Sequence, residues 1–194
     1  FTIKRLIEVI GIFIFCLGVL LFLALVSYSP TDPNFIFPKN AVINNLLGFQ
    51  GSYISDLFIQ SAGLITYLIP VTYIFTGANI FKKKEIFLLI ENTFFIILYS
   101  LVGSLFLSYY YKNTFSLYIN GNGGFVGNFF NETFLKNIIA SNENIFYYFF
   151  IILTIIFFLV SINFNIKNFI QLIKNAIQFL FKKENKNYTN KNEI

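Results

Sequence analysis

Four long apolar runs constrain the fold of this chain more than any other feature. A helix needs about 20 apolar residues to cross the hydrocarbon core of a bilayer, because each residue advances it by about 1.5 Å. The chain supplies four such stretches, and we predict membrane-spanning helices at about residues 6–27, 57–80, 86–110 and 145–164. The first run is too long for a signal peptide and no small-residue cleavage site follows it, so we expect a retained anchor.

The composition agrees with a membrane protein and limits its chemistry. Of the 194 residues, 56% are apolar and only 12% are charged, whereas globular proteins carry about 25% charged residues. The sequence contains no His and a single Cys, so the usual zinc or haem ligand sets cannot be assembled from it. It contains neither a nucleophile elbow nor a phosphate-binding P-loop. We therefore predict no catalytic, metal or cofactor site in this chain.

The basic residues predict which loops face the cytoplasm. Three of them flank the spans on one side, namely Lys39, Lys112 and Lys136, and the other eleven lie on the opposite side. The cytoplasmic side of a membrane protein carries the excess of Lys and Arg. We therefore predict an all-α, four-helix integral membrane domain with both termini, and the turn at residues 82–84, in the cytoplasm. The net charge of +5 then reflects topology, and we expect no direct DNA binding from this domain.

Two further segments have apolar residues at helical spacing but carry too many polar residues to span a membrane. Residues 125–139 are expected to form an amphipathic helix at the outer interface. Residues 166–181 are expected to form a basic amphipathic helix along the anionic inner leaflet, with partner binding as the alternative. Residues 182–194 are charged and Asn-rich, which is typical of the start of a disordered linker. The membrane domain itself is expected at residues 1–165.

Ionisable groups in membrane spans are functional candidates, because a charge in hydrocarbon is costly. Glu8, Asp56 and Glu91 qualify, and each lies within about two turns of a predicted span end. For Asp56 the alternative is a capping role at the start of its helix. Pro70 predicts a kink in the second span, where Thr66 could satisfy the freed backbone. If these groups line a pathway, the chain would be a small transporter or channel subunit.

Three motifs in order resemble a known family. Residues 27–35 read Ser-Tyr-Ser-Pro-Thr-Asp-Pro-Asn-Phe, which resembles the S-Y-x-P-x-D-P-x-F signature of the FtsK family of septal DNA translocases. A second set of matches follows in residues 48–77, and a G-G-x-x-G motif precedes the last span. Ser52 and Ser55 stand where family members often have Ala. The matching positions are Ser27, Tyr28, Pro30, Asp32, Pro33, Gly48, Gly51, Asp56, Gln60, Gly63, Pro70, Gly77, Gly123, Gly124 and Gly127.

The resemblance implies a role as well as a fold. A full-length member would be a hexameric, ATP-driven pump of double-stranded DNA that couples chromosome segregation to cell division. This chain would be its four-span N-terminal domain in the bacterial inner membrane. It would anchor the motor at the division septum, and the matching positions would serve structure or contacts with other division proteins. ATP and magnesium are expected only in the motor domain, which this sequence does not contain.

Overall fold

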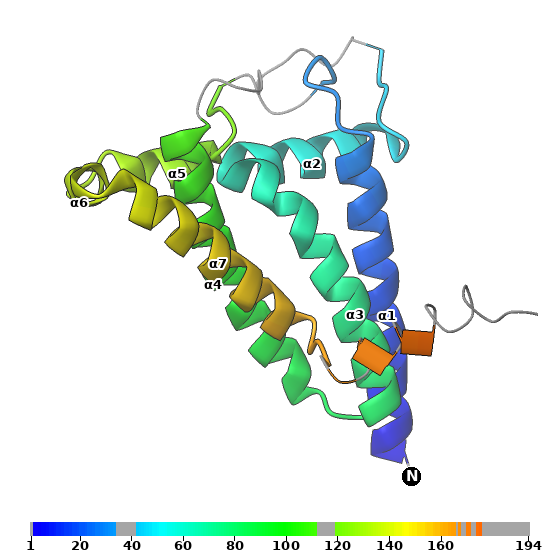
Figure 1. Cartoon of the computed structure of the whole chain (residues 1–194). Helices are drawn as coiled ribbons and strands as arrows, with labels where there is room; N and C mark the ends of the chain where they lie inside the picture. Colours follow the sequence, from blue (N-terminus) through cyan, green and yellow to red (C-terminus); the bar gives the residue numbers. More distant parts are fainter. Residues whose placement is uncertain are drawn as a thin grey trace, which may run out of the picture. The chain divides into compact units, whose positions relative to one another are not determined.

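The computed structural model describes residues 2–33, 42–111 and 119–165, together with residues 167, 170, 171, 174 and 175. All the regular elements in this described part of the chain are helices (Figure 1). By its internal contacts the chain divides into two units, Phe1–Asn163 and Phe164–Ile194. The first unit contains every long helix described below.

The second unit is described at only a few positions. Residues 167, 170, 171, 174 and 175 are helical, and the N–H of Lys167 donates to the side-chain oxygen of Asn165 at 3.1 Å. The amphipathic helix predicted at residues 166–181 otherwise lies outside the described residues, as does the linker predicted at 182–194.

Four helical segments are long and apolar enough to cross a membrane. Three of them are continuous α-helices: α1 (Thr2–Val26), α4 (Phe87–Tyr110) and α7 (Glu143–Ser161). The fourth, Gly48–Lys83, is composed of α2 (Gly48–Ala62), the 3-10 helix η1 (Gly63–Tyr67) and α3 (Leu68–Lys83). The prediction of an all-helical protein with four candidate spans is therefore confirmed.

The second predicted span differs from the structure because the helix is interrupted at Gly63. This residue has φ 72° and ψ −149°, a conformation that is open to glycine and strained for other residues. As a result, α2 runs across one end of the bundle while α3 descends beside α1 (Figure 1). The span expected at residues 57–80 is therefore divided between two helices: residues 57–62 belong to α2, and α3 begins at Leu68.

Pro70 does not kink this helix, because it is the third residue of α3. The first four N–H groups of a helix have no intrahelical acceptor, so a proline in the first turn costs no hydrogen bond. Thr66 lies in η1 and donates its hydroxyl to the carbonyl of Gly63 at 2.7 Å. The change of direction therefore falls before the proline, at Gly63–Tyr67.

The segment predicted as one amphipathic helix at residues 125–139 forms two short helices, α5 (Gly124–Asn131) and α6 (Leu135–Ser141). Thr133 lies between them. Its hydroxyl donates to the carbonyl of Phe130 at 2.6 Å, and the same oxygen lies 3.4 Å from the N–H of Leu135. A threonine that bonds the local backbone in this way favours a helix end over a helix interior.

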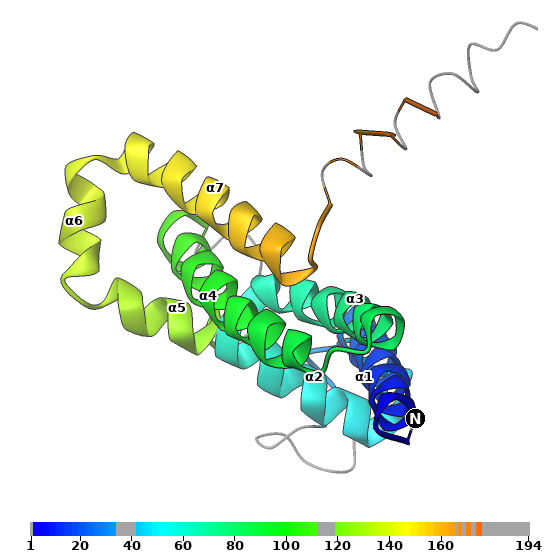
Figure 2. The same cartoon turned by 90° about the horizontal axis from the view of Figure 1, so that it is seen from below.

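The α1 and α3 helices pack closely because glycines line their contact. A side chain at Gly77 would place its Cβ 2.6 Å from the carbonyl oxygen of Gly11, and one at Gly18 would lie 3.1 Å from that of Pro70. Lipid provides no hydrophobic force between helices, so close backbone approach is a main source of their association. Figures 1 and 2 both show α1 and α3 side by side.

One end of the bundle gathers basic residues. Glu8 accepts hydrogen bonds from Arg5 at 2.7 Å and from Lys84 at 2.8 Å, which fixes the start of α1 beside the turn between α3 and α4. Asn163, just after α7, bonds Asn79 and Asn92 near the same turn. We call this the lysine end, with residues 82–84 at its centre. The start of the first span and the end of the last therefore lie at the same end.

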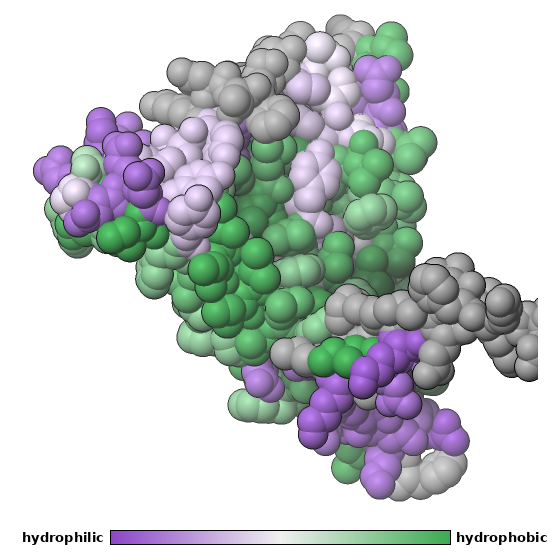
Figure 3. Space-filling view, viewed as in Figure 1, coloured by the Kyte–Doolittle hydropathy of each residue, from purple (hydrophilic) through white to green (hydrophobic). Residues whose placement is uncertain are grey.

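The opposite end, which we call the loop end, is formed by residues 27–33, residues 42–47, α2 and α5. Figure 3 shows a broad apolar band between the two ends, with polar surface near the N-terminus of α1 and over α5 and α6. An apolar band bounded by polar ends is the surface expected of a domain set in a bilayer.

Candidate functional site at the loop end

A buried carboxylate organises the first motif. Asp32 is only 1% exposed. One of its oxygens accepts the backbone N–H and the side-chain amide of Asn44, both at 3.0 Å, and the other accepts the N–H of Asn45 at 2.8 Å. A buried carboxylate must be compensated by donors of this kind. Asp32 therefore ties the segment after α1 to the segment before α2.

Pro30 shapes the turn that presents Asp32. The N–H of Asp32 donates to the carbonyl of Ser29 at 3.1 Å, which places Pro30 at the second position of a four-residue turn. The fixed φ of proline favours that position. Gly48 closes a second turn, in which its N–H donates to the carbonyl of Asn45 at 2.9 Å and its φ is 64°. Both motif residues thus act through the backbone.

Asn45 joins these turns to the end of α1. Its side-chain amide donates to the carbonyl of Ala24 at 2.8 Å and to that of Ser27 at 3.3 Å. The last carbonyls of a helix lack intrahelical donors, so Asn45 caps α1 from a distance of about twenty residues in sequence. The Ser27 hydroxyl accepts the N–H of Leu46 at 3.1 Å. Sequence reasoning missed Asn45, since one Asn does not stand out in a chain so rich in Asn.

The first turns of α2 pack under these loops. The Ser52 hydroxyl donates to the carbonyl of Pro33 at 2.8 Å, and that of Ser55 donates to the carbonyl of Ser52 at 3.0 Å. Both serines that depart from the family pattern therefore form hydrogen bonds to the backbone. Gly51 leaves space for the preceding loop, because a Cβ there would lie 2.6 Å from the Cβ of Leu47.

Asp56 has a different role from the helix cap considered for it. Because α2 begins at Gly48, Asp56 lies inside the helix, where it is 7% exposed. It accepts the Tyr28 hydroxyl at 3.2 Å and the Gln60 amide at 3.4 Å. Burial, and after it the negative charge of Asp56, raises the pKa of Tyr28 well above its usual value. Tyr28, just after α1, is thus joined to Asp56 and Gln60 of α2 in one hydrogen-bonded group.

Close contact between Gly63 and Gly124, which we call the glycine joint, connects the end of α2 to the glycine-rich residues 121–127. Gly63 and Gly124 both have positive φ, 72° and 65°. Their backbones pass so closely that a Cβ at Gly124 would lie 2.5 Å from the nitrogen of Gly63. The N–H of Leu64 donates to the carbonyl of Asn122 at 2.9 Å. The glycines after residue 120 therefore serve chain packing.

The same joint rests on two serines of α4. A Cβ at Gly123 would lie 2.6 Å from the Cβ of Ser108, and one at Gly127 would lie 2.9 Å from it. Ser104 donates its hydroxyl to the carbonyl of Ala62 at 2.7 Å, which satisfies the end of α2. The small residues of α4 and α5 thus hold the break in the second span in place.

Three asparagines that the sequence did not single out complete the layer. Asn122 is fully buried and donates its side-chain amide to the carbonyl of Tyr111. Asn128 accepts the hydroxyl of Ser108 at 2.7 Å, and Asn120 donates to the carbonyl of Gln60 at 3.2 Å. Their signal in the sequence is their position beside Gly121, Gly123 and Gly127, where turns require side chains that bond the backbone.

The remaining motif residues lie elsewhere. Pro70 and Gly77 belong to the α1–α3 contact described above. The residues considered for a transport pathway do not converge: Asp56 bonds Tyr28, Glu91 is exposed on α4, and the carbonyl of Pro70 faces Gly18. Within the described ranges, no group of three or more His, Cys, Asp or Glu side chains could hold a metal ion.

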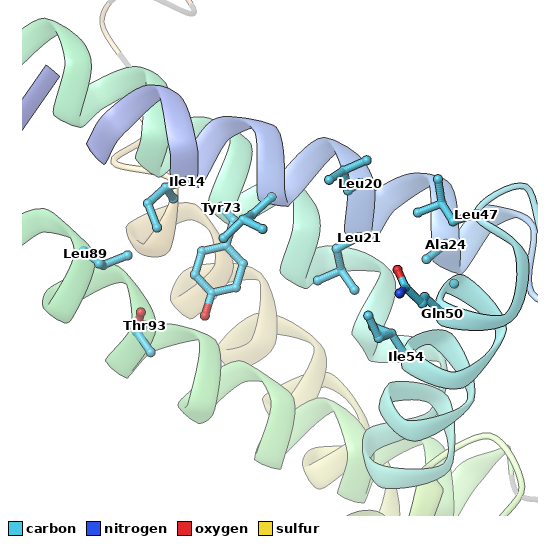
Figure 4. A pocket seen from close by; sticks show the side chains of 12 residues that line it. Ile14, Leu20, Leu21, Ala24, Leu47, Gln50, Ile54, Tyr73, Leu89 and Thr93 are labelled. Carbon is cyan, nitrogen blue, oxygen red and sulfur yellow. The ribbon is translucent and has the colours of Figure 1, made fainter. Parts of the chain in front are cut away.

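A groove of about 670 Å³ lies beneath α2, between α1 and α4 (Figure 4). Its walls are mainly aliphatic, and the Tyr73 ring projects into it from α3. Neither Asp56, Glu91 nor Pro70 is among its lining residues, which are Ile14, Leu17, Leu20, Leu21, Ala24, Leu47, Gln50, Gly51, Ile54, Tyr73, Leu89 and Thr93. The groove gives the hypothesis of a transport pathway no charged group to use.

Four candidate spans, a lysine end that holds both the start of the first span and the end of the last, and a packed loop end define a multi-pass membrane domain. The chain belongs to the family described as the 4TM region of DNA translocase FtsK/SpoIIIE, whose model matches residues 3–174. It is therefore the membrane region of an FtsK-like protein.

Individual relatives agree with the family match. The chain is 40% identical over 60 residues to the DNA translocase FtsK of Rickettsia bellii, which is 31% of this chain and 8% of the relative. It is 30% identical over 90 residues to that of Rickettsia typhi, covering 45% and 12%, and 31% identical over 99 residues to that of Shewanella oneidensis, covering 50% and 11%. The chain thus matches only a small part of each relative. No solved structure matches it.

Proposed function

We propose that this chain anchors an FtsK-like DNA translocase in the bacterial inner membrane and targets it to the division septum, coupling chromosome segregation to division. The observation that carries the proposal is that the two ends of the domain differ in composition and structure. The family motif residues of the loop end hold its turns together by hydrogen bonds and close packing, whereas Arg5, residues 82–84 and the exit of the last span lie at the lysine end.

The lysine end would face the cytoplasm. It carries residues 82–84 and Arg5, and Lys and Arg accumulate on the cytoplasmic side of membrane proteins. Because the end of α7 lies there too, a motor that follows this domain would emerge on the side where the chromosome is. ATP and magnesium would be bound by that motor, and we assign no DNA contact to the membrane domain.

The loop end would then face the periplasm, where the membrane-anchored domain meets other division proteins. A surface built from interlocked turns presents its exposed side chains in fixed positions, which lowers the entropic cost of recognition. Tethering would also confine the motor to a plane and raise the local concentration of its subunits, which favours assembly of a homo-oligomer, a hexamer by family resemblance.

Localisation of residues 1–194 fused to a fluorescent protein tests this function. We expect the fusion to concentrate at the septum, and Asp32→Ala to remain in the membrane while septal enrichment falls. Asn137→Ala is the matched control, since Asn137 is an exposed residue of α6 outside the motif layer. Uniform membrane fluorescence of the unaltered fusion would contradict the targeting role.

A further inference from the structure

The last residue of the first unit, Asn163, is held by side chains from two other helices. The unit ends at this residue, which has a φ of 51°. A positive φ is tolerated mainly by Gly and by Asn. The chain therefore leaves the bundle through a specific backbone conformation just after α7.

Both the oxygen and the nitrogen of the Asn163 side-chain amide form hydrogen bonds. Its oxygen accepts from Asn92 at 3.2 Å and from Asn79 at 3.3 Å, and its nitrogen donates back to the oxygen of Asn92 at 3.3 Å. Asn79 also lies 3.5 Å from the carbonyl of Ile162. Helices α3 and α4 thus each contribute one amide to the exit of α7.

Asn92 is fixed in the orientation that this contact requires. It is 1% exposed, and its second amide proton goes to the hydroxyl of Thr76 at 2.8 Å. A buried amide that uses both its donors and its acceptor cannot rotate without leaving polar groups unsatisfied. Removal of Asn92 would therefore free Asn163 as well.

The polar contact continues one turn deeper between the same three helices. The hydroxyl of Thr72 lies 3.0 Å from that of Ser161 and 3.2 Å from that of Tyr99. All three residues are fully buried. Lipid provides no hydrophobic force between helices, because lipid tails are as apolar as the side chains. Interhelical hydrogen bonds of this kind therefore favour one helix position over neighbouring ones.

We propose that Asn79, Asn92 and Asn163 form a clamp that transmits load from the cytoplasmic chain into α3 and α4, so that α7 does not bear it alone. The inference rests on the proposed function, in which a motor that pulls on DNA is attached beyond residue 163. Without the clamp, a pull on the linker would act along α7, in which only Phe150 and Ser161 are buried within the domain.

Mechanical extraction from a supported bilayer tests the clamp. The 194-residue chain is held at constant force through a C-terminal handle, and the lifetime of α7 in the membrane is measured. We expect Asn92→Ala and Asn163→Gly to shorten that lifetime roughly threefold to tenfold, the range that the loss of interhelical hydrogen bonds in a membrane implies. Asn163→Gly removes the side-chain amide at a position where glycine still permits the positive φ.

Two controls separate the clamp from general destabilisation. Asn137→Ala, on α6, should leave the lifetime of α7 unchanged. Pulling through an N-terminal handle extracts α1 first, and the clamp variants should not change that step. Unchanged lifetimes under C-terminal load, or equal losses from both ends, would overturn the proposal. Loss of septal targeting with an intact mechanical effect would instead count against the proposed function alone.

Discussion

The carboxylate of Asp32 accepts the backbone N–H of Asn45 at 2.8 Å. This bond joins the first family motif to the loop before α2, and the side chain of the same Asn45 caps α1. One buried acid thus determines how the first span connects to the interrupted second one. The motif therefore has an architectural role at the loop end.

Replacing Asp32 by Asn should lower the stability of the domain by about 2–3 kcal/mol, because hydrogen bonds to a charged acceptor are lost and an amide hydrogen is left facing other donors. Thermal unfolding in detergent measures the change. Thr31→Ala, at an exposed position of the same turn, should cost less than about 0.5 kcal/mol. Equal effects of the two substitutions would show that the buried carboxylate is unimportant.

Gly63→Ala should be more costly than Gly48→Ala, although both residues have a positive φ. A Cβ at Gly48 meets nothing within 4 Å, whereas one at Gly63 would collide with the backbone of Asn122 and Gly123. We expect about 1 kcal/mol of strain at Gly48 and at least about 2 kcal/mol more at Gly63, because backbone must move. Comparing the unfolding temperatures of the two variants isolates the effect of the close backbone contact at Gly63. Similar losses of stability in both variants would contradict the glycine joint.

Gly77→Val should separate α1 from α3. The added side chain would enter the backbone of α1 near Gly11, and helices in lipid depend on such close contacts. Phe75→Leu, on an exposed position of the same helix, serves as the control. Disulfide formation between cysteines placed at the two helices reports their contact. It should be lost in Gly77→Val and retained in the control.

Alkaline pH should weaken the loop end through Tyr28. Its raised pKa means that the folded state keeps a proton which the unfolded state releases above about pH 10. The contribution of the neutral phenol is therefore fully present below about pH 10 and is lost progressively above it. The unfolding temperature of the native chain should fall more steeply from pH 9 to pH 11 than that of Tyr28→Phe. Parallel curves would contradict the Tyr28–Asp56 contact.

The sequence predicted the parts of the fold that depend on hydropathy. Long apolar runs locate α1, α4 and α7 because lipid requires them. The interruption at Gly63 was not predictable in this way, since it depends on a backbone angle and on the distant residue Asn122. The polar partners were hidden for a related reason: Asn45 at the loop end, and Asn92 and Asn163 at the lysine end, differ from the other asparagines only in what surrounds them.

The transmembrane orientation is tested most directly by labelling single cysteines in intact cells. Cys16, the one native cysteine, is replaced by Ser, and a cysteine is placed at Lys83 of the lysine end or at Asn137 on α6. A membrane-impermeant maleimide should label position 137 in intact cells and position 83 only after the inner membrane is opened. Labelling of position 83 from outside would contradict the cytoplasmic lysine end, and with it the attachment of a cytoplasmic motor.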